Sequence, residues 1–415
     1  MRTYTFNFKN AFVFVVFTCT SLIAIAQKDS TFIQRIPADS AKQKLNMDAV
    51  YNRPFITAGK LPLAIGGYLE ANTKYASTDG ITDGLSFQMR RMTLFFSSTI
   101  AKRIKFLSEL EFEDGTKEIN IEFAAMDIEF HPLLNLRGGI VMNPIGAYNQ
   151  NHDGPRWDFI DRPISASTII PSTLSNAGFG IHGKYFSRGW IVGYETYLTN
   201  GFDDNIISNQ ENRTSLAAGK SNPEKFEESI NGLPLFTGKL AIRNRKIGEL
   251  GISYMNGVYN KFQADGFVLD KKRSMSIVAV DFNTSLLKNR INIIAEMAKV
   301  MVDVPATYGQ TYGKQQSGMF LDIVGTIFQR PMLGWEKAKI NLVLRTEYAD
   351  YNQGKFNETG DNISDHIWAI VPGISFRPTG TTVLRFNYKY QQQTDLLGNP
   401  PANTGIIYVG FSTYF

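Results

Sequence analysis

Hydrophobic and polar side chains alternate along most of the chain after residue 61. In the stretch 382–391, Leu384 and Phe386 fall on one face of an extended strand, whereas Arg385 and Asn387 fall on the other. The final stretch, 404–415, has the same period and ends on an aromatic residue. A period of two is that of a β-strand whose two faces meet different surroundings. The pattern therefore predicts strands with lipid on one side and water on the other.

Similar segments repeat through the rest of the chain. There are about sixteen of them, at 62–75, 85–99, 103–113, 118–130, 134–143, 176–186, 190–200, 235–244, 248–259, 273–286, 291–302, 316–328, 338–350, 366–377, 381–393 and 404–415. Every second connection is short, whereas 144–175 and 201–234 are long. Short periplasmic turns that alternate with longer outer loops are typical of bacterial outer-membrane barrels. We therefore expect residues 61–415 to form an all-β fold, a transmembrane antiparallel β-barrel of about 16 strands. The alternation weakens near Asp127 and Met275, where we expect β-bulges.

The charged side chains determine which face of the sheet points inward. A charged residue facing lipid near the membrane midplane costs about 2–4 kcal/mol, and the opposite assignment would place about a dozen charges there. The polar face should therefore line a water-filled interior. The predicted pore-lining residues are Arg91, Arg137, Lys239, Arg243, Arg345, Arg377, Arg385, Lys389, Glu109, Glu111 and Glu347.

The long segment 144–175 is the candidate constriction, because loops of this length are usually functional or disordered. We expect it to fold into the lumen, with Arg156 and Arg162 facing the solute and Asp158 and Asp161 providing the opposing field. The alternative is that these charges satisfy one another where the loop meets the wall.

The amino-terminal region has a different composition. Arg2 and Lys9, an apolar run and an A-I-A site at 24–26 predict a signal peptide at 1–26, followed by a periplasmic extension at 27–60. The single cysteine, Cys19, falls in the signal peptide, so we expect no disulfide, thiolate metal site or cysteine nucleophile in the mature chain. We also predict no bound metal and no cofactor. Without Arg2 and Lys9, 41 basic residues face 38 acidic ones, which argues against a nucleic-acid partner.

Several short motifs point to a known family. They are Q-M-R-R-M-T-L at 88–94, E-L-E-F-E at 109–113, L-R-G-G at 136–139, N-P-I-G at 143–146 and F-I-D-R-P at 159–163. In these motifs the chain resembles the phosphate-selective porins O and P. The resemblance implies a homotrimer of sixteen-stranded barrels, each with a pore narrowed by inward-folded loops and a positively charged path for anions. This chain departs from that pattern, because Glu70, Glu122, Glu195 and Glu296 join the predicted lumen acids and nearly balance the two signs.

The sequence thus predicts a porin in the bacterial outer membrane that lets small hydrophilic solutes diffuse passively, with a preference for anions such as phosphate. We do not expect an enzyme, because His131, His152, His182 and His366 are scattered along the chain. Two alternatives remain open: an outer-membrane hydrolase built on a Ser/His pair, and a non-conducting structural or adhesive barrel.

Overall fold

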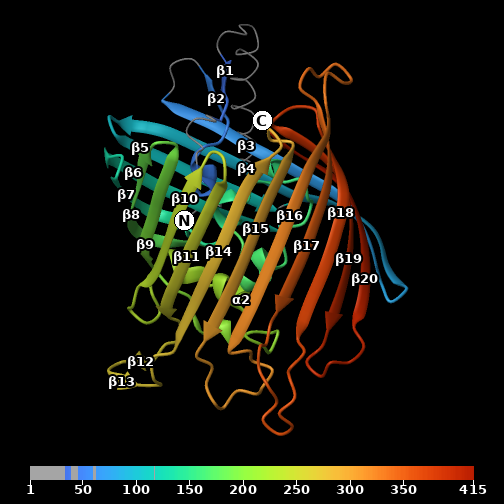
Figure 1. The fold of residues 1–415 in the computed structure, drawn as a ribbon. Helices are drawn as coiled ribbons and strands as arrows, with labels where there is room; N and C mark the ends of the chain where they lie inside the picture. The colour runs from blue at the N-terminus through green and yellow to red at the C-terminus, as the bar shows by residue number, and fades with distance from the viewer. Residues whose placement is uncertain (1–32, 39–44, 59–61, 116) are drawn as a thin grey trace, which may run out of the picture.

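The computed structural model describes residues 33–38, 45–58, 62–115 and 117–415. Most of them form an antiparallel barrel (Figure 1). Each wall strand pairs with the next along the chain, and the last pairs with the first from Thr404↔Thr78 to Tyr414↔Tyr68, so the barrel is closed. The prediction of a 16-stranded barrel is confirmed. The wall strands are β3 (Leu63–Thr78), β4 (Ile81–Ala101), β5 (Ile104–Glu113), β6 (Glu118–His131), β7 (Leu134–Met142), β8 (Ser175–Ser187), β9 (Trp190–Thr199), β10 (Leu235–Asn244), β11 (Gly248–Val258), β14 (Ser274–Leu286), β15 (Ile291–Val302), β16 (Gln315–Gln329), β17 (Lys339–Asp350), β18 (His366–Arg377), β19 (Thr382–Thr394) and β20 (Ala402–Tyr414).

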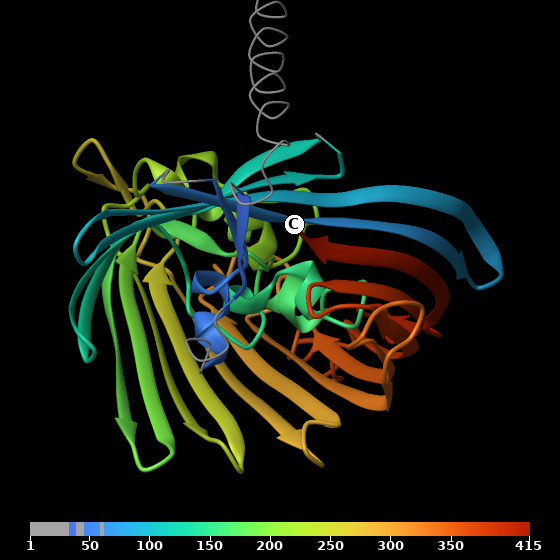
Figure 2. The same cartoon turned by 90° about the horizontal axis from the view of Figure 1, so that it is seen from above.

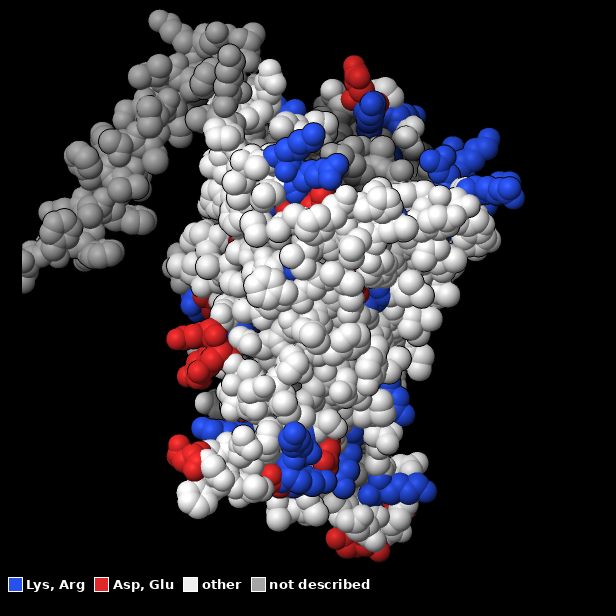
Figure 3. All heavy atoms as spheres, turned by 90° about the vertical axis from the view of Figure 1, so that its left-hand side faces the viewer, with Lys and Arg blue, Asp and Glu red and all other residues white. Residues whose placement is uncertain are grey.

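The outer face of the wall is apolar. On β17, the outward-facing Leu342 and Leu344 are exposed, whereas the next residue, Arg345, points inward and is 1% exposed. On β19, Leu384 and Phe386 are exposed, and Arg385 is buried. Figure 3 shows one side of the barrel with a broad uncharged band at mid-height and most Lys and Arg side chains above and below it. The outward apolar, inward polar arrangement follows from the period of two along each strand.

Smaller elements complete the described chain. Near the amino terminus, β1 (Ile33–Ile36) pairs with β2 (Phe55–Ala58), and β2 pairs with β3 through Ile56↔Ile65 and Thr57↔Ala64. The short helices are η1 (Asn46–Tyr51), η2 (Asn149–Asn151), η3 (Gly154–Arg156), η4 (Ser165–Ile169), η5 (Asp204–Ile206), α2 (Leu216–Lys220) and η6 (Pro223–Phe226), and β12 (Gln263–Ala264) pairs with β13 (Phe267–Val268). No helix among the described residues is both long enough and apolar enough to span a membrane. The predicted signal peptide, 1–26, lies outside the described residues.

Residues 45–58 and part of the segment 144–175 lie inside the barrel. Seen along the barrel axis, η1 and the helical part of 144–175 lie within the ring of strands (Figure 2). The first belongs to residues 45–58, which precede the wall, and the second connects β7 to β8. We call the end of the barrel with the short connections and the carboxyl terminus the short-turn end (Figure 1), and the opposite end the long-loop end.

The two expected bulges have different outcomes. The β5–β6 register shifts between Glu109 and Leu110, opposite Phe123 and Ile121, so β6 does contain a bulge close to Asp127. The pairing of Met275 with Gly257 and Val302 is regular, so the bulge expected there is wrong. Met275 is an apolar residue that points inward and is 1% exposed.

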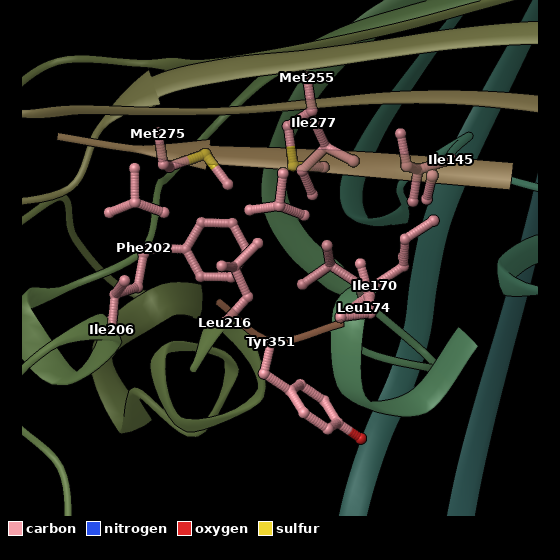
Figure 4. Packing of buried hydrophobic residues seen from close by; sticks show 14 of the residues in the cluster. Ile145, Ile170, Leu174, Phe202, Ile206, Leu216, Met255, Met275, Ile277 and Tyr351 are labelled. Carbon is pink, nitrogen blue, oxygen red and sulfur yellow. The ribbon is translucent and has the colours of Figure 1, made fainter. Parts of the chain in front are cut away.

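The inward face near the long-loop end is apolar, which corrects the expectation of a polar interior along the whole wall. Met255, Met275 and Ile277 point inward from β11 and β14 and pack against Phe202 and Leu216 of the connection that follows β9. Figure 4 shows these side chains gathered in one region, with Ile170 and Leu174 beside them and Tyr351 at its lower edge. The polar lining is therefore confined to the rest of the barrel, because the long-loop end holds an apolar core of its own.

Candidate functional site: the filled lumen

Residues 45–58 run along the inside of the wall from β11 to β3. The Asn46 amide donates to the Glu249 carboxylate on β11 at 2.7 Å. The Lys184 ammonium on β8 contacts the Asp48 carboxylate. Further along, the Tyr51 ring lies 3.6 Å from the guanidinium of Arg137 on β7. The segment is thus held by the wall at several successive strands before β2 joins the sheet.

A glycine on the wall makes room for this segment. A Cβ atom at Gly193 on β9 would lie 2.3 Å from Cδ1 of Leu45, closer than real Cβ contacts come. Leu45, Met47 and Ala241 form a buried apolar cluster at this point. The first residues of the segment are therefore anchored by apolar contacts as well as by charge.

Arg53 joins the amino-terminal segment to both the wall and the inward loop. Its guanidinium lies 2.8 Å from Glu109 on β5 and 2.6 Å from Asp153 in the loop, and all three side chains are almost fully buried. Burial would lower the pKa of His152, but Glu109 and Asp153 beside it outweigh this effect and raise the pKa. Burial would likewise raise the pKa of Asp153, yet Arg53 holds it below its ordinary value. Removing one partner of such a buried pair leaves an uncompensated charge.

The same cluster has the composition of a metal site. Glu109, His152 and Asp153 offer ligand atoms that all lie within 4.8 Å of one another. Arg53 already contacts both carboxylates, so a divalent cation would have to displace its positive charge. The group fits a buried ion pair better than a metal centre.

The inward loop is anchored to the opposite wall. Asp158 accepts hydrogen bonds from Arg377 at 2.9 Å and from Ser375 at 2.5 Å. Arg385 donates to the main-chain oxygen of Phe159 at 2.8 Å and forms an ion pair with Glu70, also at 2.8 Å. Burial would raise the pKa of Asp158, but the Arg377 guanidinium holds it below its ordinary value. The loop is therefore attached to β18, β19 and β3 together.

Asp161 is attached to the wall a short distance away. Its carboxylate forms an ion pair with Arg90 at 2.6 Å and accepts a hydrogen bond from the Tyr408 hydroxyl. Its main-chain oxygen accepts from Arg345 at 2.7 Å, and Arg345 in turn pairs with Asp322 at 2.6 Å. Both predicted loop carboxylates, Asp158 and Asp161, are thus engaged by arginines of the wall.

The two predicted loop arginines have different surroundings. Arg156 donates to the main-chain oxygens of Ala49 and Asn52, each at 2.9 Å, and to the Tyr414 hydroxyl at 3.0 Å. Arg162 makes one hydrogen bond, to the Ser172 hydroxyl at 3.0 Å. Its other two nitrogens, Nε and Nη2, are buried without a hydrogen-bond partner among the described residues. Contact with solute stays a prediction for both arginines. Of the two, Arg162 is the better candidate, because fewer of its nitrogens are already engaged by the described residues.

The predicted pore-lining residues lie on the inner face of the wall. Arg243 and Arg377 are partly exposed, and the rest are buried: Arg91, Arg137, Lys239, Arg345, Arg385, Lys389, Glu109, Glu111 and Glu347. Most of the cations pair with wall carboxylates; the pairs are Arg91 with Glu113, Arg137 with Asp127, Lys239 with Asp281, Arg345 with Asp322 and Lys389 with Glu347. Their function as a pore lining stays a prediction, because these side chains contact the two lumen segments and one another.

Sequence reasoning missed several partners in this network. Asp281 and Asp322 share the inward parity of their strands, so the alternation could have identified them. Arg53 could not be found in this way, because it lies outside any alternating segment. Its partners Glu109 and Asp153 are far away in the sequence, and only the folded chain brings them together.

Two of the cavities in the described part of the chain differ widely in size. One of about 10 Å³ lies beside Asp161, Arg345, Glu347 and Lys389, which is room for about one water molecule. The second, of about 680 Å³, lies near the long-loop end between β6 and the connection that contains α2 and η6.

Comparisons with known proteins place this architecture. No protein-family model matches the chain. An uncharacterized protein of Aquifex aeolicus (strain VF5) is 28% identical over 210 residues, which are 49% of this chain and 46% of that protein. The match thus spans about half the length of this curated relative.

Three solved structures share the fold. The anion-selective porin from Comamonas acidovorans has a TM-score of 0.52 at 11% identity, covering 85% of this chain and 99% of that one. The Salmonella typhi OmpF complex with daunomycin has a TM-score of 0.52 at 10% identity, covering 85% and 97%. The high-pH structure of Pseudomonas putida OprB has a TM-score of 0.52 at 8% identity, covering 85% and 94%. None of these comparisons names the phosphate-selective family, so that resemblance stays a prediction.

The closed barrel, its apolar outer band and its shared fold define the class. The protein has the sixteen-stranded barrel fold of these outer-membrane proteins, and its closed wall and apolar outer band place it in the bacterial outer membrane. A barrel can span a bilayer because closure leaves no strand edge unpaired in lipid.

Proposed function

We propose that this protein is an outer-membrane porin through which small hydrophilic solutes diffuse passively. The observation that supports this most is a sixteen-stranded barrel with charged side chains on its inner wall and with an inward loop that carries Arg162, two of whose nitrogens have no hydrogen-bond partner in the described part of the chain. A barrel of this size is wide enough for an aqueous channel. The conducting path passes Arg162 and requires that the lumen segments shift from the closely packed arrangement described above.

The proposal includes a preference for anions, with phosphate as the first solute to test. Arg162 lies close enough for its charge to act on Glu111 and Glu113 of β5. The buried nitrogens of Arg162 would gain hydrogen bonds from an anion. The Glu113 carboxylate, by contrast, is already paired with Arg91 at 2.7 Å.

Planar-bilayer recordings in a KCl gradient test both parts of this proposal. Discrete conductance steps are expected, and the sign of the reversal potential should be that of a channel more permeable to chloride than to potassium. Addition of phosphate should reduce the chloride current. In Arg162→Gln the reversal potential should move toward cations, whereas Lys355→Gln, which alters an exposed loop lysine, should leave it unchanged. Absence of steps would favour a non-conducting structural or adhesive barrel, and an unchanged reversal potential in Arg162→Gln would remove the anion proposal.

We also propose that the barrel performs no chemistry on its solutes. The ring of His152 contacts Glu109, Asp153, Arg53 and the Asn149 oxygen, and none of these is a serine nucleophile. Turnover of a lipid or peptide substrate by the purified barrel that is lost in His152→Ala would instead support the hydrolase alternative.

The oligomer proposed is a homotrimer, as the family resemblance implies. Chemical cross-linking of the barrel in intact membranes should give a ladder that ends at three chains. A ladder that stops at one chain would contradict this part of the proposal.

A further inference from the structure

The cavity of about 680 Å³ near the long-loop end has an unusual wall. Five consecutive residues of β6, 118–122, line one side of it. The opposite side is formed by the α2–η6 connection, including Lys220, Asn222, Lys225 and Phe226. Its volume lies within the range of small-molecule sites, roughly 300–1,000 Å³.

The strand that lines this cavity has a free edge. On one side, β6 pairs with β5 from Glu113↔Glu118 onward. On the other side, β6 pairs with β7 only from Ala124↔Ile140 toward the short-turn end. Among the described residues, no strand therefore pairs with the second edge of 118–123. Six residues of strand extend about 20 Å, and their unpaired backbone groups can accept another extended chain.

Charges of opposite sign face each other across the cavity. Glu118 and Glu122 belong to the strand, and Lys220 and Lys225 belong to the connection. Glu122 is 4% exposed and has no hydrogen bond or ion pair with any described residue. No described carboxylate lies within 4.0 Å of either lysine ammonium. The two signs form no direct ion pair, although the charge of Glu122 acts on Lys225 across the cavity, and each can bind a ligand group of opposite charge.

The local contacts of the lysines orient them without neutralising them. The Lys220 ammonium donates to the Ser172 oxygen and the Thr173 hydroxyl, each at 2.7 Å. The Lys225 ammonium donates to the Lys220 oxygen at 3.1 Å. Burial, together with repulsion from Lys220, lowers the pKa of Lys225 to about 8. The ammonium is thus still mostly protonated at neutral pH, and a bound carboxylate would stabilise this form.

We infer that this cavity binds a short zwitterionic peptide in extended form along the free edge of β6. Its ammonium group lies toward Glu122 and its carboxylate toward Lys220 and Lys225, while its main chain pairs with residues 118–122. Three or four extended residues, roughly 10–14 Å, fit within the free edge of about 20 Å. The inference of peptide binding is argued from the geometry of the cavity. A role of the cavity as the entry site for a transported solute rests on the proposed porin function.

Binding to the detergent-solubilised full barrel, measured by isothermal titration calorimetry, tests this inference. The probe is a tripeptide of alanine with free termini. It is compared with the same peptide acetylated and amidated, with an N-methylated peptide that keeps both charges, and with inorganic phosphate. The free tripeptide should bind most tightly. The blocked peptide should lose the contribution of the charges, and the N-methylated peptide should lose the contribution of the strand edge.

Two variants locate the site. Glu122→Gln and Lys225→Gln should each weaken tripeptide binding about two- to fivefold, the effect of an ion pair in a water-accessible cavity. Lys355→Gln on an exposed loop is the matched control and should not change it. Equal binding of free and blocked tripeptide, or wild-type affinity in both site variants, would overturn the inference.

The same preparation separates this inference from the proposed function. If the barrel binds tripeptide but shows no conductance steps in planar bilayers, the cavity remains a peptide site and the porin proposal fails. If the barrel conducts and the tripeptide does not bind, the porin proposal remains and the peptide site is removed.

Discussion

The interior of the barrel contains two regions that are held together differently. Around the inward loop and the amino-terminal segment, buried ion pairs such as Arg345 with Asp322 and Arg53 with Asp153 join residues of different strands and segments. Near the long-loop end, Leu216 and Phe202 pack with Met255 and other apolar side chains in one buried cluster. Ion pairs fix a segment in one geometry because each partner is costly to leave alone, whereas apolar contacts mainly require that volume be filled. The charged region should therefore respond most to loss of one partner, and the apolar region to loss of volume.

Arg345→Leu is expected to have the largest effect. It leaves Asp322 buried without its partner, which costs about 3–5 kcal/mol, and it removes the hydrogen bond to the Asp161 oxygen. Urea unfolding of the barrel in lipid vesicles measures the change. In the double variant Arg345→Leu/Asp322→Leu much of this stability should return, and a single variant as stable as the wild type would contradict the account of the charged region.

Leu216→Ala tests the apolar region. Leu216 is fully buried between the α2 connection and the wall, and such truncations cost about 2–4 kcal/mol when the cavity does not collapse. The effect should be local, seen as faster hydrogen exchange of amides 204–220 while the wall strands exchange as before. Leu397→Ala, at an exposed loop position, is the control. Uniform loss of protection over the whole barrel would show that the region is not a separate core.

Acid should release the inward loop. The Arg377 guanidinium holds the pKa of Asp158 below its ordinary value, against the effect of burial. A carboxyl with a lowered folded pKa contributes stability above its unfolded pKa of about 3.9, and this contribution is lost as the pH falls through the folded value. The protection factors of amides 155–170, which compare measured with intrinsic exchange at each pH, should therefore fall below about pH 4.

Asp158→Asn should weaken the same loop contacts already at neutral pH, by about 1–3 kcal/mol. The variant should also lose part of the acid response of amides 155–170. An unchanged acid response in the variant would assign the effect to other carboxyls, such as Asp153 and Asp161.

Lys105→Ala should have the smallest effect. Lys105 and Glu129 form an ion pair at 2.5 Å, but both side chains are about half exposed. Exposed pairs of this kind contribute about 0–1 kcal/mol. The urea midpoint should stay close to that of the wild type, and a loss as large as that of Arg345→Leu would mean that burial does not set the difference between the pairs.

The sequence by itself determined the barrel. Strand positions, the inward direction of residues such as Arg345 and Arg385, and the number of strands all follow from a period of two, which is a local property of neighbouring residues. The same rule made Met275 look like a bulge, because the rule assumes that everything inside the barrel is wet. Whether an inward position is wet or dry depends on what lies opposite it.

Only the tertiary structure decided what fills the barrel. Arg53 meets Glu109 and Asp153, and Glu70 meets Arg385, although these partners are far apart in the sequence. The difference between the two loop arginines also appears only in the folded chain. Arg156 binds the amino-terminal segment, whereas two nitrogens of Arg162 have no hydrogen-bond partner among the residues described. Non-periodic segments have no face to predict, so their place depends on contacts that form only after the wall has closed.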